Sequence, residues 1–282
     1  MAMGKYKLHK KFTPYKHSYK IPHGVSMEEM TLASAVQLEF PKTKIYRSNR
    51  QILGSKEIDI WIPSHNLGIE FNGNRYHSSA MGKDGSYHLN KTILAERKHV
   101  HLLHIFSDMW ETSKSQTIDR IKKLMGRYQT ILIDECSIKQ LTKREGQEFY
   151  NSMHLNGVDS RADRFIGIFY NGYIVSVLEC SNKAIYGYQD IRNLKIQNGL
   201  QSILDAYPEL KSLPVYVDRS LLENLEWEAI GYRQIECTNP RLFYTKDFKS
   251  RIPESRLTES QKSDMHTIYD CGELVLKKEL SN

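Results

Sequence analysis

Hydrophobic and polar residues alternate in two neighbouring stretches of the first third of the chain. Isoleucine occupies every second position of Ile58–Ile62, and the same spacing recurs in Leu67–Phe71. The turn-rich tetrad Pro63-Ser-His-Asn66 separates them. Alternation with a period of two predicts strands that bury one face, so the sequence predicts a hairpin here.

Helical patterns flank this hairpin. Ser26-Met-Glu-Glu29 has the form of a capping box, and Pro41 ends the helix predicted to follow it. Residues 86–98 and 117–128 are also predicted to be helical, with a buried strand at 100–106. The apolar positions assigned to the inner side of the first helix are Met30, Ala33, Val36 and Leu38. Residues 28–129 therefore form a predicted α/β unit.

A second unit is predicted over residues 130–250. Phe165–Tyr170 and Tyr173–Cys180 have strand-like composition, and Asn171-Gly172 between them is the strongest short hairpin signal. Residues 200–210 are predicted to be helical and residues 213–217 to form a strand. Residues 251–282 are predicted to be a polar C-terminal tail with one apolar patch, Ile268 to Leu276.

The composition is that of an ordinary globular chain, with 40% apolar, 26% charged and 10% aromatic residues. No apolar run is long enough to span a membrane. Met1 to Lys11 is basic but lacks the apolar segment of a secretory signal. The four cysteines lie far apart, at 136, 180, 237 and 271, which fits neither a disulfide scaffold nor a zinc clip. We therefore expect a reducing, cytoplasmic location (the host cytoplasm if a phage encodes the chain).

The net charge of +7 is concentrated near the N-terminus. Residues 1–27 hold six lysines and no acid, residues 28–130 hold 15 basic and 11 acidic side chains, and residues 131–282 hold 19 and 22. Such a basic arm is predicted to contact nucleic-acid phosphates; a disordered solubilising tail is the alternative. The arm lysines predicted to bind nucleic acid are Lys5, Lys7, Lys10, Lys11, Lys16 and Lys20.

Two acidic residues face one another in the predicted hairpin. If cross-strand partners have numbers that sum to 129, Asp59 is directly opposite Glu70, with Cβ atoms roughly 4.5–5.5 Å apart. Two such carboxylates repel unless one is protonated or a cation lies between them. Hard oxygen ligands suit Mg²⁺ (or Mn²⁺), which completes its shell with water and phosphate. A solvent-exposed hairpin with incidental acids is the alternative.

Histidines follow this pair. His77 comes after the second strand, and its ordinary pKa suits proton transfer near neutrality. His88 and Lys91 are three residues apart on the predicted helix 86–98 and so share a face, where Lys91 could hold a phosphate as a point charge. An ordinary solvated helix face is the alternative for these two. Zinc binding by His99, His101 and His104 fits less well, because 101 and 104 point to opposite faces of a strand.

Several motifs recur in an order typical of one nuclease family. They are Glu29, Glu57-Ile-Asp59, Ile69-Glu-Phe-Asn-Gly73, Tyr76-His77, Tyr87-His-Leu-Asn-Lys91, and Leu103-His-Ile-Phe106 with Asp108 and Trp110. Over roughly residues 26–125 they resemble the PD-(D/E)XK nuclease core, a mixed sheet flanked by helices. More narrowly, they resemble the very-short-patch repair endonucleases and the related phage homing endonucleases with an EDxHD motif.

This resemblance implies roles for individual residues. Asp59 and Glu70 would bind the metal, His77 would act as general base or orient the attacking water, and Glu29 would assist from the helix. Asn72 stands where the family has its lysine, so Lys91 would replace it. The implied catalytic set is Asp59, Glu70, His77, Lys91, Glu29, His88 and Asn72, with Arg75 as a further DNA contact.

The second unit resembles the acetyltransferase-like (GNAT) α+β domains that follow such nucleases. The residues that carry this resemblance are His154-Leu, Asn171-Gly172, Val217-Asp-Arg219, Gly231-Tyr232, Asn239-Pro240 with Tyr244, and Tyr269-Asp-Cys-Gly272. Acyl transfer needs a glycine-rich turn that cradles pyrophosphate at a helix start. Lys195-Ile-Gln-Asn-Gly199 has one glycine only, which favours a DNA-contacting role.

The sequence thus predicts a hydrolase: a Mg²⁺-dependent DNA endonuclease, of the phage homing type, acting on double-stranded DNA. A dimer is expected if both strands are cut. Three alternatives stay open. They are a mismatch-directed repair nickase, a non-catalytic DNA-binding protein that keeps the nuclease fold, and an acetyltransferase with a nucleic-acid-binding appendage.

Overall fold

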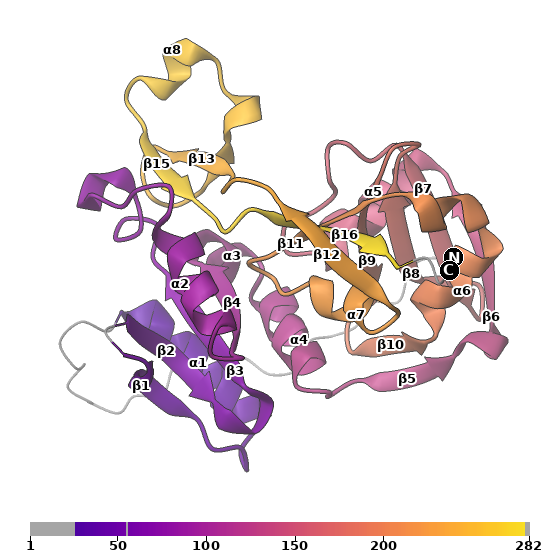
Figure 1. The fold of residues 1–282 in the computed structure, drawn as a ribbon, viewed down its shortest axis with the longest axis horizontal. Helices are drawn as coiled ribbons and strands as arrows, with labels where there is room; N and C mark the ends of the chain where they lie inside the picture. Colours follow the sequence, from indigo (N-terminus) through magenta and orange to yellow (C-terminus); the bar gives the residue numbers. More distant parts are fainter. Residues whose placement is uncertain (1–25, 55, 280–282) are drawn as a thin grey trace, which may run out of the picture.

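The chain folds into two mixed α/β units that lie side by side (Figure 1). The structure is a computed structural model that describes residues 26–54 and 56–279. The predicted basic arm falls outside these residues. No helix of the described part is long and apolar enough to cross a membrane.

The first unit is built on a four-stranded sheet with the order β1-β2-β3-β4. Strands β1, β2 and β3 pair antiparallel, while β4 is parallel to β3 because α2 crosses over between them. The strands are β1 (Tyr46–Leu53), β2 (Lys56–Ile62), β3 (Leu67–Asn72) and β4 (His101–Phe106). The helices are α1 (Met27–Glu39), α2 (Tyr87–Glu96), α3 (Ser107–Thr112) and α4 (Lys114–Leu124).

The core of this unit lies between the sheet and α1. Leu32 and Val36 of α1 are fully buried against the isoleucines of β2 and β3. Leu38, predicted to lie on the inner side, is instead 63% exposed. The inner side of α1 runs through Leu32 and Val36, which are four residues apart, and Leu38 falls outside that stripe.

The predicted register of the β2–β3 hairpin is confirmed. Ile60 pairs with Ile69 and Ile62 pairs with Leu67, so the partner numbers sum to 129 as predicted, and Asp59 and Glu70 are the next residues along the two strands. Asn66 closes the turn in the left-handed conformation with φ 46°. Strand β3 is buried along its whole length, so Glu70 is a carboxyl group inside the unit.

The second unit is built on a seven-stranded sheet with the order β12-β16-β11-β9-β8-β7-β6. Asn171-Gly172 forms the predicted β7–β8 turn, with φ values of 48° and 81°. The strands are β6 (Cys136–Leu141), β7 (Arg164–Tyr170), β8 (Tyr173–Cys180), β9 (Ile185–Asp190), β11 (Val215–Asp218), β12 (Tyr232–Cys237) and β16 (Glu273–Lys278). The helices are α5 (Lys143–Met153), α6 (Gly199–Ala206) and α7 (Asn224–Glu228), and β5 (Gln129–Leu132) pairs with β10 (Leu194–Gln197) in a separate ribbon.

Residues 251–279 do not form the predicted tail. Strand β16 lies inside the large sheet between β12 and β11, where Leu274 and Leu276 are buried. The preceding segment forms a three-stranded sheet with the order β14-β13-β15. Its elements are β13 (Leu242–Thr245), β14 (Ile252–Pro253), α8 (Glu259–Lys262) and β15 (His266–Tyr269). The apolar patch seen in the sequence therefore marks core strands.

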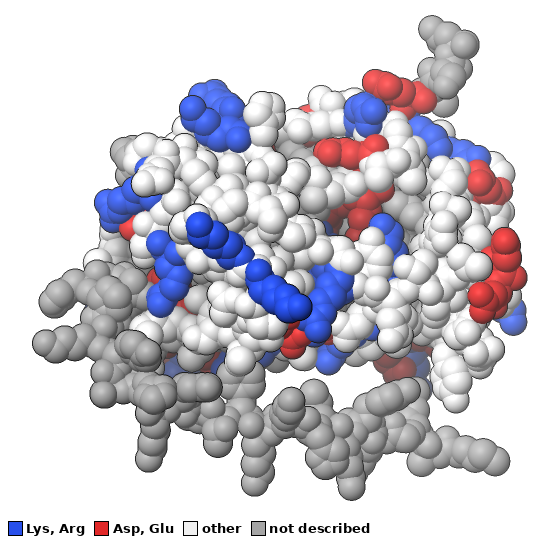
Figure 2. All heavy atoms as spheres, turned by 90° about the horizontal axis from the view of Figure 1, so that it is seen from below, with Lys and Arg blue, Asp and Glu red and all other residues white. Residues whose placement is uncertain are grey.

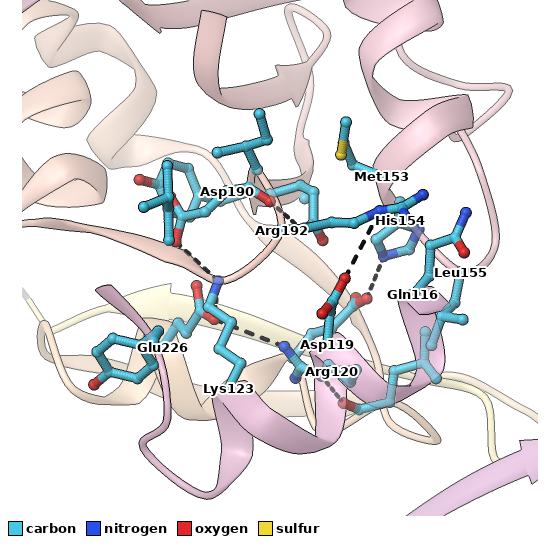
Figure 3. A pocket seen from close by; sticks show the side chains of 18 of the residues that line it. Gln116, Asp119, Arg120, Lys123, Met153, His154, Leu155, Asp190, Arg192 and Glu226 are labelled. Atoms are coloured by element: carbon cyan, nitrogen blue, oxygen red, sulfur yellow. Dashed lines mark hydrogen bonds and ion pairs between the residues drawn. The ribbon is translucent and has the colours of Figure 1, made fainter. Parts of the chain in front are cut away.

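Helix α4 of the first unit fills an opening in the second. Strands β9 and β11 run parallel but pair only at Ile185 and Val215, so they separate beyond that point. Figure 3 shows Lys123 of α4 reaching between Asp190 and Glu226, at 2.9 and 2.8 Å. These two carboxylates outweigh the effect of burial and raise the pKa of Lys123 to about 12. A cavity of about 40 Å³ is left in the opening.

Removing this buried ammonium should destabilise the protein strongly. Lys123→Ala leaves the buried Asp190 and the partly buried Glu226 without this cation, so we expect a loss of about 3 kcal/mol in the free energy of unfolding, measured by urea denaturation. Lys114→Ala, on the same helix, removes an ion pair whose side chains are more than half exposed and should cost less than about 1 kcal/mol. Equal losses for the two variants would contradict the buried role of Lys123.

Candidate functional site

The predicted acidic pair lies at the meeting point of β2, β3 and α2. Asp59 is half-buried and Glu70 is 2% exposed. The backbone N–H of Phe71 donates to Asp59 Oδ2 at 2.7 Å, which fixes the Asp59 carboxylate beside β3. Both acids therefore come from the predicted hairpin, and the crossover helix α2 covers them.

Lys91 supplies the cation that pairs with Glu70. Its ammonium donates to Glu70 Oε2 and is itself buried. Burial lowers the pKa of Lys91, but the charges of Glu70 and Asp59 outweigh burial and raise it. Lys91 was predicted to hold a phosphate, with an ordinary solvated helix face as the alternative. The structure shows it inside the unit, because the face it shares with His88 packs on β3 and β4.

This ammonium forms its ion pair with Glu70, and Asp59 has no ion pair within the described residues. Burial, and then the charge of Asp59, raise the pKa of Glu70 from 4.5 to about 8. Burial also raises the pKa of Asp59, against the opposing charge of Lys91. Glu70 Oε1 has no hydrogen-bond partner in the described residues. A proton or a second cation would compensate the remaining charge.

Glu29 of α1 adds a third carboxyl group. The Glu29 N–H donates to Ser26 Oγ at 3.0 Å, but the Glu29 side chain does not return to the N-cap as a capping box would require. It turns toward Arg47, at 3.6 Å. Burial, and then Asp59, raise the pKa of Glu29 to about 7. The capping pattern that explained Glu29 in the sequence is only half formed, and its carboxyl group belongs to the site.

Aromatic rings pack around the histidines predicted for this site. His77 and His88 are stacked, with ring centroids 5.1 Å apart. His88 also lies edge-on to His104 and Phe106, at 5.5 and 5.3 Å. Burial, and then the charge of Lys91, lower the pKa of His77 to about 4, and burial lowers the pKa of His88 as well. Both imidazoles are therefore neutral near pH 7.

A hydrogen-bonded chain supports this cluster from below. The amide of Asn72 donates to His104 Nδ1 at 3.1 Å, and His104 Nε2 lies 2.8 Å from Thr92 Oγ1. The Thr92 hydroxyl is in turn 3.2 Å from the thiol of Cys271 in the second unit. His104 is fully buried, as the packed alternative to zinc binding requires. Sequence reasoning missed Thr92 and Cys271, because no spacing links residues so far apart.

Buried polar atoms without a partner concentrate at this site. Native proteins pair nearly all such atoms with protein or water. The site atoms that lack a hydrogen-bond partner within the described residues are Glu70 Oε1, Asn72 Oδ1, His77 Nδ1, His88 Nε2, both side-chain polar atoms of the neighbouring Asn74, and Glu29 Oε1, which has only the ion pair with Arg47. The donor set fits a hard cation with water, since its charged members are carboxylates.

The metal prediction rests on two carboxylates rather than a preformed cage. No group of three or more His, Cys, Asp or Glu side chains is arranged to hold a metal ion in residues 26–54 and 56–279. Mg²⁺ is commonly held by one or two carboxylates, with water and phosphate completing its shell. The pair Asp59 and Glu70 meets that lower requirement.

Seven of the predicted residues have contacts in this part of the first unit. Lys91 pairs with Glu70, His77 stacks on His88, Asn72 bonds to His104, Asp59 accepts from the Phe71 N–H, and Glu29 pairs with Arg47. Arg75 is exposed on the loop between β3 and α2, and Lys5, Lys7, Lys10, Lys11, Lys16 and Lys20 lie outside the described residues. Arg47, which sequence reasoning missed, reaches Glu29 from the edge strand β1.

A second candidate site lies where α6 begins. A cavity of about 400 Å³ is lined by Asn198, Gly199, Tyr128 and Lys195, among others. Asn198 does not cap the helix with its side chain. A Cβ on Gly199 would come within 2.5 Å of the Tyr188 hydroxyl oxygen, so this position requires glycine. The single glycine of the predicted Lys195–Gly199 turn is therefore placed at the helix start, beside an open cavity.

Comparison with known proteins gives a similarity to a solved structure. No family model matches the chain, and no curated protein matches it. The chain is similar to a crystal structure of a GNAT family acetyltransferase from Elizabethkingia anophelis with acetyl-CoA bound. The identity is 16%, the match covers 52% of this chain and 99% of that chain, and the TM-score is 0.31.

This comparison corrects the predicted activity. The matched structure is a transferase, so the predictions of a Mg²⁺-dependent DNA endonuclease and of a hydrolase are wrong on this finding. Nothing in the comparisons supports membership of the PD-(D/E)XK or very-short-patch repair families. The site gives a physical reason as well, because the ammonium of Lys91, predicted to bind phosphate, is bonded to Glu70.

Proposed function

We propose that the first unit binds nucleic acid through a divalent cation held by Asp59 and Glu70. The observation that carries this proposal is the buried oxygen of Glu70 that has no partner in the described residues, next to a second carboxylate and only one ammonium. Mg²⁺ or Mn²⁺ would supply the missing positive charge and present open coordination positions to a phosphate oxygen. The proposal concerns the binding of phosphate groups and not their hydrolysis.

Positive side chains lie on the strand and the loop next to this site. Lys56 and Lys83 lie over the ring of Tyr87, at 5.6 and 4.1 Å from its centroid, and Arg75 is exposed on the same loop as Lys83. In Figure 2, Lys and Arg predominate in the left half of the face shown, and most Asp and Glu lie in the right half. A long phosphate-bearing chain fits this distribution better than a small ligand does, because the cations extend well beyond the acidic pair.

The second unit supports a second candidate function. We propose that it is a GNAT-like domain and that its cavity at the start of α6 holds a cofactor of the coenzyme A type. The uncapped N–H groups of α6 suit a phosphate group, and Lys195 and Tyr128 stand beside them. The chain would then be an acetyltransferase with a nucleic-acid-binding appendage. Because α4 fills the opening between β9 and β11, such a cofactor would bind at the outer cavity.

Nucleic-acid binding should depend on a divalent cation and on Asp59. We expect a fluorescent DNA duplex to bind about tenfold more tightly in Mg²⁺ or Ca²⁺ than in EDTA, a difference of about 1.4 kcal/mol, as measured by anisotropy. Asp59→Asn should remove that difference, because it removes a negative ligand. Asp84→Asn, an exposed acid on the nearby loop, should retain it. Equal binding with and without a cation would contradict the proposal.

The same site should make stability depend on pH and on metal. A carboxyl group whose pKa is raised on folding stabilises the fold below its ordinary pKa and loses that contribution as the pH rises through its folded pKa. The pKa of Glu70 is raised from 4.5 to about 8, and that of Glu29 from 4.5 to about 7, so these values bound the pH range in which each contribution is lost. We expect the melting temperature to fall between pH 6 and 9, and Mg²⁺ to raise it more at pH 8.5 than at pH 6.

Glu70→Gln serves as the control for that experiment. The amide is neutral at every pH, so the variant should show a weaker pH dependence and little rise with Mg²⁺. Each kcal/mol corresponds to roughly 2–4 °C in a chain of this size class, which calorimetry resolves. If wild type and variant show the same dependence of melting temperature on pH, Glu70 is not the group that causes it.

Cofactor binding to the second unit has its own measurement. We expect titration calorimetry to detect coenzyme A binding, and Lys195→Ala to weaken it at least fivefold by removing a cation beside the helix start. Lys183→Ala, which is exposed on the same unit, should bind as the wild type does. Absence of heat with coenzyme A would remove the acetyltransferase candidate and leave the nucleic-acid proposal standing.

A further inference from the structure

The three-stranded sheet of residues 242–269 belongs to the second unit by chain order but packs on the first. The Thr267 N–H donates to Ser79 Oγ at 2.9 Å. The ring of Tyr269 lies against Gly85, where a Cβ would come within 3.3 Å of it. Figure 1 shows this sheet projecting beside the loop that precedes α2. That loop carries His77 and Lys83 and joins the strand of Glu70 to the helix of Lys91. The projecting sheet therefore packs on the loop next to the acidic site.

An ion pair anchors the projecting sheet beside the histidine cluster. Arg251 donates to both carboxylate oxygens of Asp108, at 2.9 and 3.2 Å. Its guanidinium also lies 3.7 Å from the ring centroid of Phe106, the ring that packs on His88. Arg251 is only 6% exposed as a side chain. The sheet is therefore held at a defined position relative to Asp59 and Glu70.

A strained aromatic residue marks the tip of this sheet, which we define as residues 245–249. Phe248 has a φ of +62°, a conformation that bulky side chains rarely adopt. Two contacts hold it there: its N–H donates to Thr245 Oγ1 at 3.0 Å, and its ring stacks on His266 at 5.2 Å. Such strain persists only where the surroundings enforce it, and it clusters at ligand clamps and active sites.

The tip also carries a net positive charge. Lys246 and Lys249 are both exposed, and the one acid of the tip, the exposed Asp247, accepts from the Lys249 backbone N–H at 3.0 Å. No carboxylate of residues 26–54 and 56–279 forms an ion pair with either lysine. Lys262 of the same segment, in contrast, forms ion pairs with Glu254 and Glu259. The tip thus combines two exposed cations with a stacked aromatic pair.

We propose that this tip is a second nucleic-acid contact, with Lys246 and Lys249 on phosphates and the Phe248–His266 pair against a base or sugar. Basic side chains interleaved with stacked aromatic rings are the combination that binds nucleic-acid strands with little regard to sequence. An acidic peptide would use the lysines but not the rings. The inference rests on the proposed function, since the same strand would reach from the tip to the cation at Asp59 and Glu70.

The experiment compares two double variants with equal loss of charge. Lys246→Ala with Lys249→Ala removes the tip cations, and Lys139→Ala with Lys143→Ala removes two exposed lysines of the second unit. Duplex binding is measured by anisotropy in Mg²⁺ over a series of salt concentrations. Each phosphate contact contributes about 0.9 to the slope of log affinity against log salt. The tip variant should therefore lose about 1.8 from that slope and bind about tenfold more weakly, while the control pair matches wild type.

The outcomes separate this inference from the proposed function. A tip variant with wild-type slope and affinity overturns the inference, while the effect of Mg²⁺ and of Asp59→Asn still tests the cation site. Wild-type protein that binds no duplex overturns both. Phe248→Ala should also weaken binding about tenfold without changing the slope, because it removes a ring and not a charge. If polyglutamate competes as well as DNA does and Phe248→Ala has no effect, the tip is a general anion contact and the inference fails.

Discussion

The burial of the Glu70 carboxylate beside one ammonium is the constraint on which the first unit depends. Glu70 lies on a strand that is buried throughout, so its charge must be met inside the unit. Lys91 meets it from α2. The crossover helix must therefore start after the loop 73–86 and pack directly on β3, which also brings His88 over the sheet. The parallel pairing of β3 with β4 follows from that same crossover.

Ion pairs tie the second unit to the first. In the opening between β9 and β11, one ammonium from α4 lies between two carboxylates; on the other side of the molecule, Arg251 returns from the projecting sheet to Asp108. Both contacts are largely removed from water, where breaking one partner costs far more than a surface pair does. These ion pairs therefore hold the two units together. A ligand bound at one site contacts a surface to which both units contribute.

The sequence alone predicts the structure correctly where hydrophobic residues alternate strictly or a turn has its typical residues. The β2–β3 register and the Asn171-Gly172 turn follow from alternation and turn chemistry, and this register makes Asp59 and Glu70 the next residues beyond the paired positions. The sequence alone is insufficient where polar residues are buried by distant partners. His88 and Lys91 look like a solvated helix face, and only the packing of α2 shows that they are interior. Strand β16 could not be placed either, because its partners β11 and β12 precede it by dozens of residues.

The distribution of charge explains why the proposed nucleic-acid surface needs parts of both units. The second unit is acidic in sum, with 22 acids against 19 basic residues over 131–282, and would repel a phosphate chain if it presented an average surface. It avoids this by pairing its acids internally, as Lys262 does with Glu254 and Glu259. The lysines of the tip remain exposed on a sheet that reaches over the basic unit. The projecting sheet belongs to the acidic second unit but packs on the basic first unit. This arrangement favours a phosphate-binding face shared by both units.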